Sequence, residues 1–159
     1  MLKDCVTDLV VFDVEITHNP TGPEVGGWDN TDRMGISVAV LWESLTGRFL
    51  FYEERDRDAL QRRLNRADVI SGFNIYSFDL PVVFQRPRRE FVWQDHIPNT
   101  AAIFDVHRLA RVGLGRRLDG ACGQGLGLDA CARLTLGAKA CGGKTGDGAD
   151  APGMYQRGE

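Results

Sequence analysis

The chain has 159 residues, of which 43% are hydrophobic and 26% are charged, and its formal net charge is −3. This length fits one domain with a buried core, and the composition is that of an ordinary globular protein. The net charge argues against a general polyanion binder. No apolar run approaches the length of a membrane span, and the first residues lack a signal-peptide pattern, so we expect a cytoplasmic protein with no membrane segment. The spacing of the cysteines predicts free thiols: Cys5, Cys122, Cys131 and Cys141.

The first predicted strand, residues 7–16, is an apolar run that contains two acids, Asp13 and Glu15. Alternate side chains of a strand share a face, so these carboxylates lie about 7 Å apart on one face. Two carboxylates this close repel, and burial increases the repulsion. A divalent cation such as Mg²⁺ or Mn²⁺ would remove the conflict. The alternative interpretation is an exposed strand end with two solvated acids.

A long loop is predicted over residues 18–33, which are rich in glycine and proline. Trp28 in this loop is either an anchor or a surface on which a base stacks, and the anchor is favoured. The strand predicted after the helix of residues 56–66 should lie parallel to its sheet neighbour. The predicted elements after the loop are strands over 35–42 and 48–52, a helix over 56–66, a strand over 69–73, a helix over 78–84 and a strand over 101–106.

Two motifs carry a resemblance to a known superfamily. The first is Phe12-Asp13-Val14-Glu15, and the second is Gly72-Phe73-Asn74 followed by Phe78-Asp79-Leu80-Pro81. In this order and spacing they resemble the first two motifs of the DEDD 3′–5′ exonucleases, which have a ribonuclease-H-like fold. Further stretches, over 34–39, 128–130 and 144–148, resemble a prokaryotic and phage branch of predicted exonucleases of this type, so that the resemblance covers nearly the whole chain.

The resemblance implies an α/β domain with a mixed five-stranded sheet flanked by helices. It further implies that Asp13, Glu15 and Asp79 converge, hold two Mg²⁺ or Mn²⁺ ions and hydrolyse a phosphodiester bond of nucleic acid by a two-metal mechanism. Single-stranded ends are the expected substrate. Two alternatives are a non-catalytic nucleic-acid-binding module and a fragment of a larger nuclease or helicase-linked protein.

Further residues are candidates for contact with nucleic acid. Thr17 loosely matches a threonine of the family that approaches the terminal nucleotide. Asn74 either orders the second motif's turn through its side chain, which is slightly favoured, or touches the scissile strand. Seven arginines lie between residues 85 and 119 and fit either a phosphate-binding stretch or solvated helix surfaces. The arginines chosen as nucleic-acid contacts are Arg86, Arg88 and Arg89.

Three other features are assigned no catalytic role. The stretch Gly142-Gly143-Lys144-Thr145 lacks the glycine spacing and the preceding strand of a phosphate-binding loop. The glycines at 123–127 lack the strand–helix–strand context of a dinucleotide site. Asp105 follows a predicted strand, and a helix N-cap is a more fitting role for it than a third metal ligand.

The end of the chain yields one more expectation. The DEDD pattern requires a fourth Asp after a Tyr or His on a final helix, and only three acids stand at matching positions here. Tyr155 is followed by no Asp before Glu159. Residues 1–159 are therefore expected to form a single domain that lacks its C-terminal helix and is inactive or nearly so alone. Residues 128–136 are expected to form a helix, and the rest of the segment after Gly113 is expected to be loop.

Overall fold

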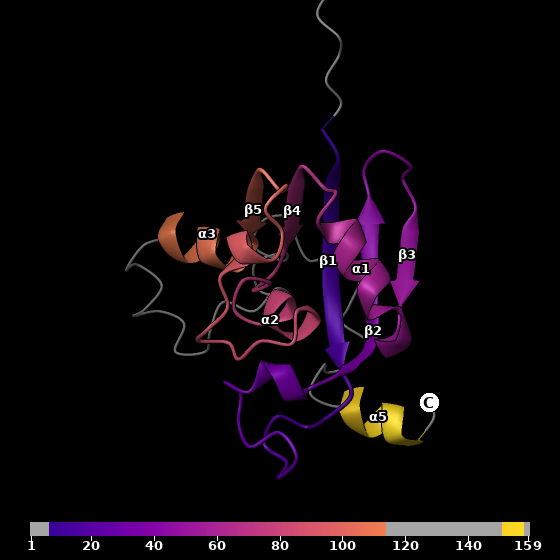
Figure 1. Cartoon of the computed structure of the whole chain (residues 1–159), viewed down its shortest axis with the longest axis vertical. Coiled ribbons are helices and arrows are strands. Elements are labelled where there is room, and N and C mark those ends of the chain that lie inside the picture. Colours follow the sequence, from indigo (N-terminus) through magenta and orange to yellow (C-terminus); the bar gives the residue numbers. More distant parts are fainter. Residues whose placement is uncertain (1–6, 114–150, 158–159) are drawn as a thin grey trace, which may run out of the picture.

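The computed structural model describes residues 7–113 and 151–157. Within them five strands form one sheet in the order β3-β2-β1-β4-β5 (Figure 1). Strands β1 and β2 pair antiparallel, as do β2 and β3, whereas β4 lies parallel to β1 and β5 parallel to β4. The strands are β1 (Leu9–Ile16), β2 (Ile36–Glu43), β3 (Phe49–Tyr52), β4 (Val69–Gly72) and β5 (Ala102–Asp105).

The helices flank this sheet (Figure 1). Helix α1 (Arg57–Leu64) connects β3 to β4, and α2 (Asp79–Val83) follows β4. Helix α3 (Val106–Gly113) continues directly from β5, and α5 (Ala151–Arg157) contacts β1 and β2. Single 3-10 turns, η1 (Thr31–Arg33), η2 (Glu54–Asp56) and η3 (Trp93–Asp95), lie in the connections. The predicted α/β fold with a mixed five-stranded sheet is confirmed, and it is consistent with a ribonuclease-H-like fold.

Strand alternation divides the side chains of β1 between two environments. Val10, Phe12 and Val14 are buried in a core that also contains Leu60 of α1 and Leu80 of α2. Burial of each such aliphatic or aromatic side chain stabilises the fold by about 1.5–3 kcal/mol. The intervening side chains of β1 project to the other face, because successive residues of a strand alternate. That alternation places both acids of the first motif on the face opposite the core.

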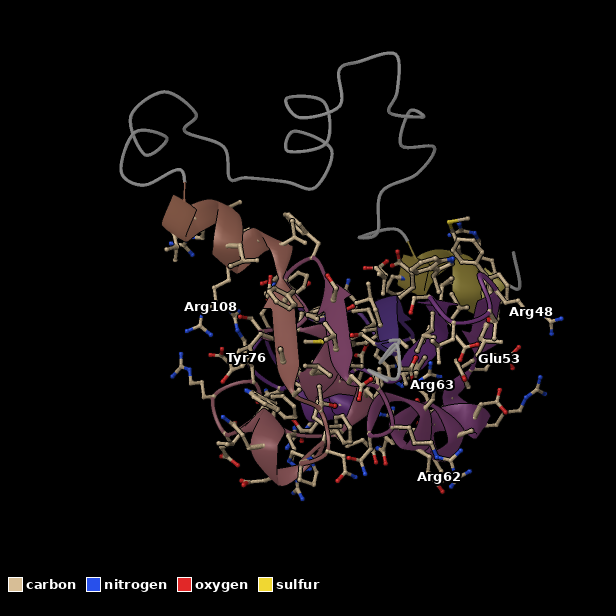
Figure 2. The ribbon with its side chains drawn as sticks, turned by 90° about the horizontal axis from the view of Figure 1, so that it is seen from above. Arg48, Glu53, Arg62, Arg63, Tyr76 and Arg108 are labelled. Atoms are coloured by element: carbon tan, nitrogen blue, oxygen red, sulfur yellow. The ribbon has the colours of Figure 1, made fainter. Side chains whose placement is uncertain are left out.

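Helix α1 ties the ends of the sheet strands together through Arg63. Its guanidinium pairs with both carboxylate oxygens of Asp8, at 3.1 and 2.8 Å, and with the Glu43 carboxylate at the end of β2. The two acids have side chains that are 17% and 13% exposed, so the pairing is shielded from solvent. Figure 2 shows Arg63 on the opposite side of the molecule from Tyr76 and Arg108. This network fixes the position from which β1 runs toward its acidic end.

The segment after Gly113 differs in part from the prediction. Residues 151–157 form a helix, so the expectation of loop there was wrong. Pro152 and Gly153 are poor helix formers, but proline is tolerated in a first turn, where its missing N–H has no intrahelical partner. The helix predicted over 128–136 lies outside the described residues. Within the described ranges, no helix is both long and apolar enough to cross a membrane.

Candidate active site

The two acids of β1 sit where the strand passes beyond its parallel partner. The described pairing of β1 with β4 ends at Val11 and Ser71, whereas β1 continues alongside β2 to Ile16. Asp13 is exposed and Glu15 is half-buried. Space beyond the end of β4 is thus available to the second motif, which follows that strand directly.

Gly72 allows the second motif to approach β1 closely. A Cβ atom built on Gly72 would lie 2.6 Å from the backbone oxygen of Phe12 and would overlap the side chain of Ile75. Only glycine avoids this overlap without a shift of the main chain. The absence of a side chain at this position therefore brings the turn between β4 and α2 against the strand that carries the acids.

Asp105 orders the turn of the second motif. Its Oδ1 accepts hydrogen bonds from the backbone N–H groups of Asn74 (2.9 Å) and Arg108 (3.2 Å), and its Oδ2 accepts one from that of Tyr76 (3.1 Å). The bond from Arg108 is a helix N-cap of α3, as predicted from the sequence. The two bonds to the turn were not predicted. Asn74, with φ of +62°, occupies the left-handed region, which asparagine tolerates better than most residues.

The expected side-chain ordering of the turn by Asn74 is not observed. Among the described residues its amide makes no hydrogen bond, and it instead lines a cavity beside Glu15. The Asn74 carbonyl accepts the backbone N–H groups of Ser77 and Phe78, each at 3.1 Å. The turn is therefore held by main-chain bonds and by the Asp105 carboxylate, and the amide of Asn74 faces the cavity.

Asp79 begins α2 and lies against β1, as the resemblance implied. Its carboxylate is 2% exposed, and its Oδ1 accepts the backbone N–H of Val14 at 2.8 Å. Val14 stands between the two acids of the first motif. One buried hydrogen bond thereby joins two residues that are 65 positions apart in the sequence, and it fixes Asp79 beside the acidic face of β1.

The electrostatics of Asp79 reflect this placement. Burial raises the pKa of Asp79 well above its usual value, and the nearby charges of Asp13 and Asp105 raise it further. The hydrogen bond from the Val14 N–H favours the ionised form and opposes the shift. A buried carboxylate held against other carboxylates is the arrangement that a divalent cation would stabilise.

The C-terminal end of α2 is held by α1. The buried guanidinium of Arg57 donates to the carbonyls of Val82 and Val83 and forms a bidentate pair with Glu54, at 2.7 and 2.6 Å. Gln61 donates to the Val83 carbonyl at 2.8 Å. These donors satisfy carbonyls that a helix end leaves without intrahelical partners. Helix α2 is therefore fixed at both ends, which positions Asp79.

The three candidate carboxylates have the right chemistry for a divalent cation, but they are not gathered into a complete metal site. Asp13, Glu15 and Asp79 are hard oxygen donors of the type that Mg²⁺ and Mn²⁺ prefer. The structure associates Asp13 with Asp79 electrostatically and directs Glu15 toward the adjoining cavity. Across residues 7–113 and 151–157, no three His, Cys, Asp or Glu side chains are gathered closely enough to hold a metal ion as they stand.

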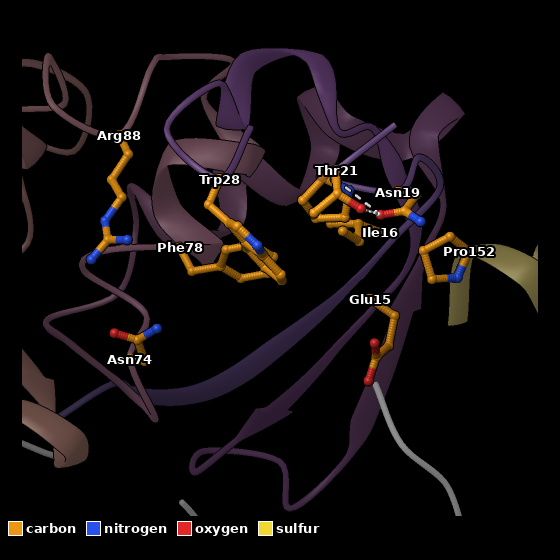
Figure 3. Close-up of a pocket in the computed structure, with 10 residues that line it drawn as sticks. Glu15, Ile16, Asn19, Thr21, Trp28, Asn74, Phe78, Arg88 and Pro152 are labelled. Atoms are coloured by element: carbon orange, nitrogen blue, oxygen red, sulfur yellow. Dashed lines mark hydrogen bonds between the residues drawn. The ribbon is translucent and has the colours of Figure 1, made fainter. Parts of the chain in front are cut away.

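A cavity of about 590 Å³ opens beside Glu15 (Figure 3). Its wall contains the ring of Trp28 from the loop after β1 and that of Phe78, which directly precedes Asp79. The two ring centroids are 6.1 Å apart, at an interplanar angle of 49°. Sequence reasoning did not place these residues together, although an aromatic residue in a loop next to an acidic motif was a signal. The other residues of the wall are Ile16, Asn19, Pro20, Thr21, Asn74, Arg88 and Pro152.

The three arginines chosen from the sequence have different surroundings. Arg88 lines the cavity. Arg89 forms an exposed ion pair with Asp29 at 2.7 Å. Arg86 is exposed and its charge acts on His96. Burial lowers the pKa of His96, and the charge of Arg86 lowers it further. Only Arg88 of the three therefore borders the cavity next to the acids.

Thr17 is separated from the cavity that contains Glu15 and Asn74. Its backbone N–H donates to the Gly35 carbonyl at 3.4 Å, across the bulge where β1 leaves β2. The side chain lines a different hollow, of about 270 Å³, which also contains charged residues of η1 and η2. The structure thus does not join Thr17 to the other candidate contacts. The remaining residues of that hollow are His18, Asp32, Arg33, Gly35, Glu54, Arg57 and Gln85.

Comparisons with known proteins complete the description of the site. No protein-family model and no curated protein sequence matches the chain. Among solved structures, the chain is similar to the family B DNA polymerase from the hyperthermophilic archaeon Pyrobaculum calidifontis, with a TM-score of 0.40 and 20% sequence identity. The similarity covers 51% of this chain and 11% of the polymerase chain.

Proposed function

We propose that this chain is a metal-dependent nuclease domain, similar to 3′–5′ exonucleases, that acts on the phosphodiester bonds of single-stranded nucleic acid. The observation that carries the proposal is the buried Asp79 carboxylate, held by the Val14 N–H beside Asp13 on a ribonuclease-H-like sheet. Apart from accepting the Val14 N–H, a buried acid kept next to other acids destabilises the metal-free protein. Perturbed carboxylates that converge in this way are typical of functional sites.

In this proposal Asp13, Glu15 and Asp79 hold Mg²⁺ or Mn²⁺, with Asp13 and Asp79 as the principal pair. A bound divalent ion supplies Lewis-acid stabilisation of the phosphate and a more acidic water. The chain itself binds and orients: the Val14 N–H fixes one oxygen of Asp79, and Arg57 holds α2 from its other end. Glu15 lines the cavity next to Asp13 and Asp79, so a substrate end bound in the cavity would lie close to these carboxylates.

The second candidate function is a nucleic-acid-binding module without hydrolysis. One observation favours it: within the described part of the chain, no three acidic side chains lie close enough together to hold a metal ion as they stand. Groups that act as a unit in catalysis are strongly non-additive, so an incomplete metal site removes most of the rate. On this account the cavity and Arg88 bind nucleic acid, and hydrolysis is weak or absent.

Hydrolysis of a 5′-labelled single strand in Mn²⁺ separates the two functions. The wild-type chain is compared with Asp13→Asn, which keeps the side-chain shape but removes a charge, and with Asp58→Asn, an exposed acid of α1 that serves as the matched control. The nuclease proposal predicts slow shortening of the strand from its 3′ end, lost in Asp13→Asn and kept in Asp58→Asn. Binding without any metal-dependent shortening would favour the non-catalytic module. Equal hydrolysis by wild type and Asp13→Asn would refute the catalytic assignment.

A further inference from the structure

We propose that the free edge of β3 is an interface between two copies of this chain, which pair their β3 strands antiparallel and so join the two sheets into one. Strand β3 is the last strand of the described sheet, and only β2 is hydrogen-bonded to it there. It stands at the opposite edge of the sheet from β5 (Figure 1). The contact uses neither the candidate carboxylates nor the cavity, so it does not depend on the proposed function.

Two phenylalanine rings are exposed on this edge strand. Phe49 and Phe51 are 63% and 69% exposed, whereas Leu50 and Tyr52 pack against the core. Edge strands that remain unpaired are commonly protected by lysine, proline or a β-bulge. Strand β3 contains neither lysine nor proline, and its register with β2 is unbroken. Exposed aromatic side chains on such an edge favour pairing with another chain.

The main-chain groups that face outward belong to the same two phenylalanines. The Glu43 N–H donates to the Arg48 carbonyl at 3.0 Å, so the main chain of Arg48 faces β2. In an antiparallel pair, residues that exchange hydrogen bonds with the partner strand alternate with residues that do not. Leu50 and Tyr52 therefore also bond toward β2. Both phenylalanines direct their N–H and C=O groups to the open edge, where a second strand would find donors and acceptors.

One register satisfies these groups and the side chains together. A two-fold axis perpendicular to the sheet at Leu50 places Phe49 opposite Phe51 of the second copy, and Phe51 opposite Phe49 of the second copy. Each such pair exchanges two main-chain hydrogen bonds. Because opposite residues of an antiparallel pair share a face, the rings also form cross-strand aromatic pairs, which stabilise sheets. A shift of one copy by two residues would leave only one of these aromatic pairs.

The charges at the two ends of β3 favour the antiparallel arrangement. Arg48 precedes the strand, whereas Glu53 and Asp56 follow it, with Arg55 paired to these acids at 3.0 and 3.9 Å. Figure 2 shows Arg48 and Glu53 together on one side of the molecule. The register described above places Arg48 opposite Tyr52 of the second copy, next to its acidic end. A parallel arrangement would instead bring like charges together, which destabilises strand pairing.

The pairing leaves the candidate site of each copy open. Phe51 lies opposite Val40, and Val40 lies opposite Asp13, so Phe51 is on the same face of the sheet as Asp13. A two-fold axis perpendicular to the sheet keeps this face on the same side in both copies. The two β1 strands would then be separated by the β2 and β3 strands of both copies, a distance of about 24 Å at roughly 4.8 Å per strand.

Sedimentation velocity of the full chain, in a reducing buffer that prevents disulfide formation, measures the association. The contact involves a strand of four residues, so we expect a weak dimer that forms over about 1–500 µM. The mass should rise with concentration from 17.6 kDa toward twice that value and no further. Phe51→Lys places a charge against Phe49 of the second copy and should weaken the dimer at least tenfold. The matched control is Phe104→Lys, an exposed phenylalanine of the opposite edge strand β5, which should not change the association.

Arg48 tests the direction of the strands. Arg48→Glu should weaken the dimer about two- to fivefold, because it places an acid beside the acidic end of the second copy, and Arg48→Lys should keep the wild-type association. Circular dichroism verifies that each variant is folded. A wild type that stays monomeric over the whole range, or assembly that continues beyond two copies, would overturn the proposal. Equal association of Phe51→Lys and the wild type would do the same, and so would loss of the dimer in Phe104→Lys.

Discussion

Replacement of Asp105 tests whether one carboxylate positions the second motif. Its two oxygens accept three backbone N–H groups, those of Asn74, Tyr76 and Arg108, at 2.9, 3.1 and 3.2 Å. Asp105→Ala leaves all three donors without this partner. Each lost bond costs about 1 kcal/mol where water can partly replace the carboxylate, so the variant should lose about 3 kcal/mol of unfolding free energy. Asp105→Asn keeps the Oδ1 acceptor but places an amide nitrogen opposite the Tyr76 N–H, and should lose about 1–2 kcal/mol.

Urea denaturation followed by circular dichroism measures both variants. With a slope of about 2 kcal/mol per molar urea, the midpoint should fall by about 1.5 M in Asp105→Ala and by less than 1 M in Asp105→Asn. Asp95→Asn, an exposed acid of η3, is the matched control and should leave the midpoint unchanged. Unfolding of Asp105→Ala within about 0.3 M of the wild-type midpoint would show that the carboxylate does not hold the turn.

Three further predictions concern the elements around the site. Because the pKa of Asp79 is raised in the folded protein, its carboxyl group holds a proton more tightly there than in the unfolded chain. The unfolding free energy of the metal-free protein should therefore fall as pH rises above 3.8, the ordinary pKa of the group. Urea titrations at several pH values should show that Asp79→Asn reduces this fall. Gly72→Ala should cost about 1–3 kcal/mol in thermal or urea unfolding, because its Cβ would overlap the Phe12 carbonyl; a neutral effect would contradict the close approach. Arg57→Ala should cost about 3 kcal/mol or more by the same measurement, because it removes the buried guanidinium that donates to the Val82 and Val83 carbonyls and pairs with Glu54; a loss under 1 kcal/mol would show that α2 is held by other contacts.

Much of the fold follows from short-range patterns. The alternation of β1 alone predicts that Asp13 and Glu15 share one face, and in the structure Val10 and Phe12 fill the opposite, buried face. The approach of Asp79 to β1 required the family resemblance, since no periodicity connects residues 65 positions apart. The N-cap of Asp105 was predicted because it depends only on a strand end followed by a helix start.

The cavity could not be predicted, because tertiary contacts build it. Trp28 and Phe78 come from segments separated by 50 positions, and their packing depends on how the loop after β1 closes. The neighbours Arg88 and Arg89 have similar sequence surroundings, yet one lines the cavity and the other pairs with Asp29. Which arginine turns inward depends on main-chain bonds between the two loops, which leave no signature in charge or periodicity.

We propose that Asp13, Glu15 and Asp79 together bind a divalent cation. Titration of Mn²⁺ into the protein, followed by the loss of the free-ion electron paramagnetic resonance signal, measures this directly and does not depend on hydrolysis. Asp79→Asn keeps the acceptor for the Val14 N–H, so it removes the charge while preserving the local hydrogen bond. We predict saturable Mn²⁺ binding by the wild type and by Asp58→Asn, weakened at least tenfold in Asp13→Asn and Asp79→Asn. Absence of binding in the wild type, or equal binding in all four proteins, would show that these carboxylates do not form a metal site.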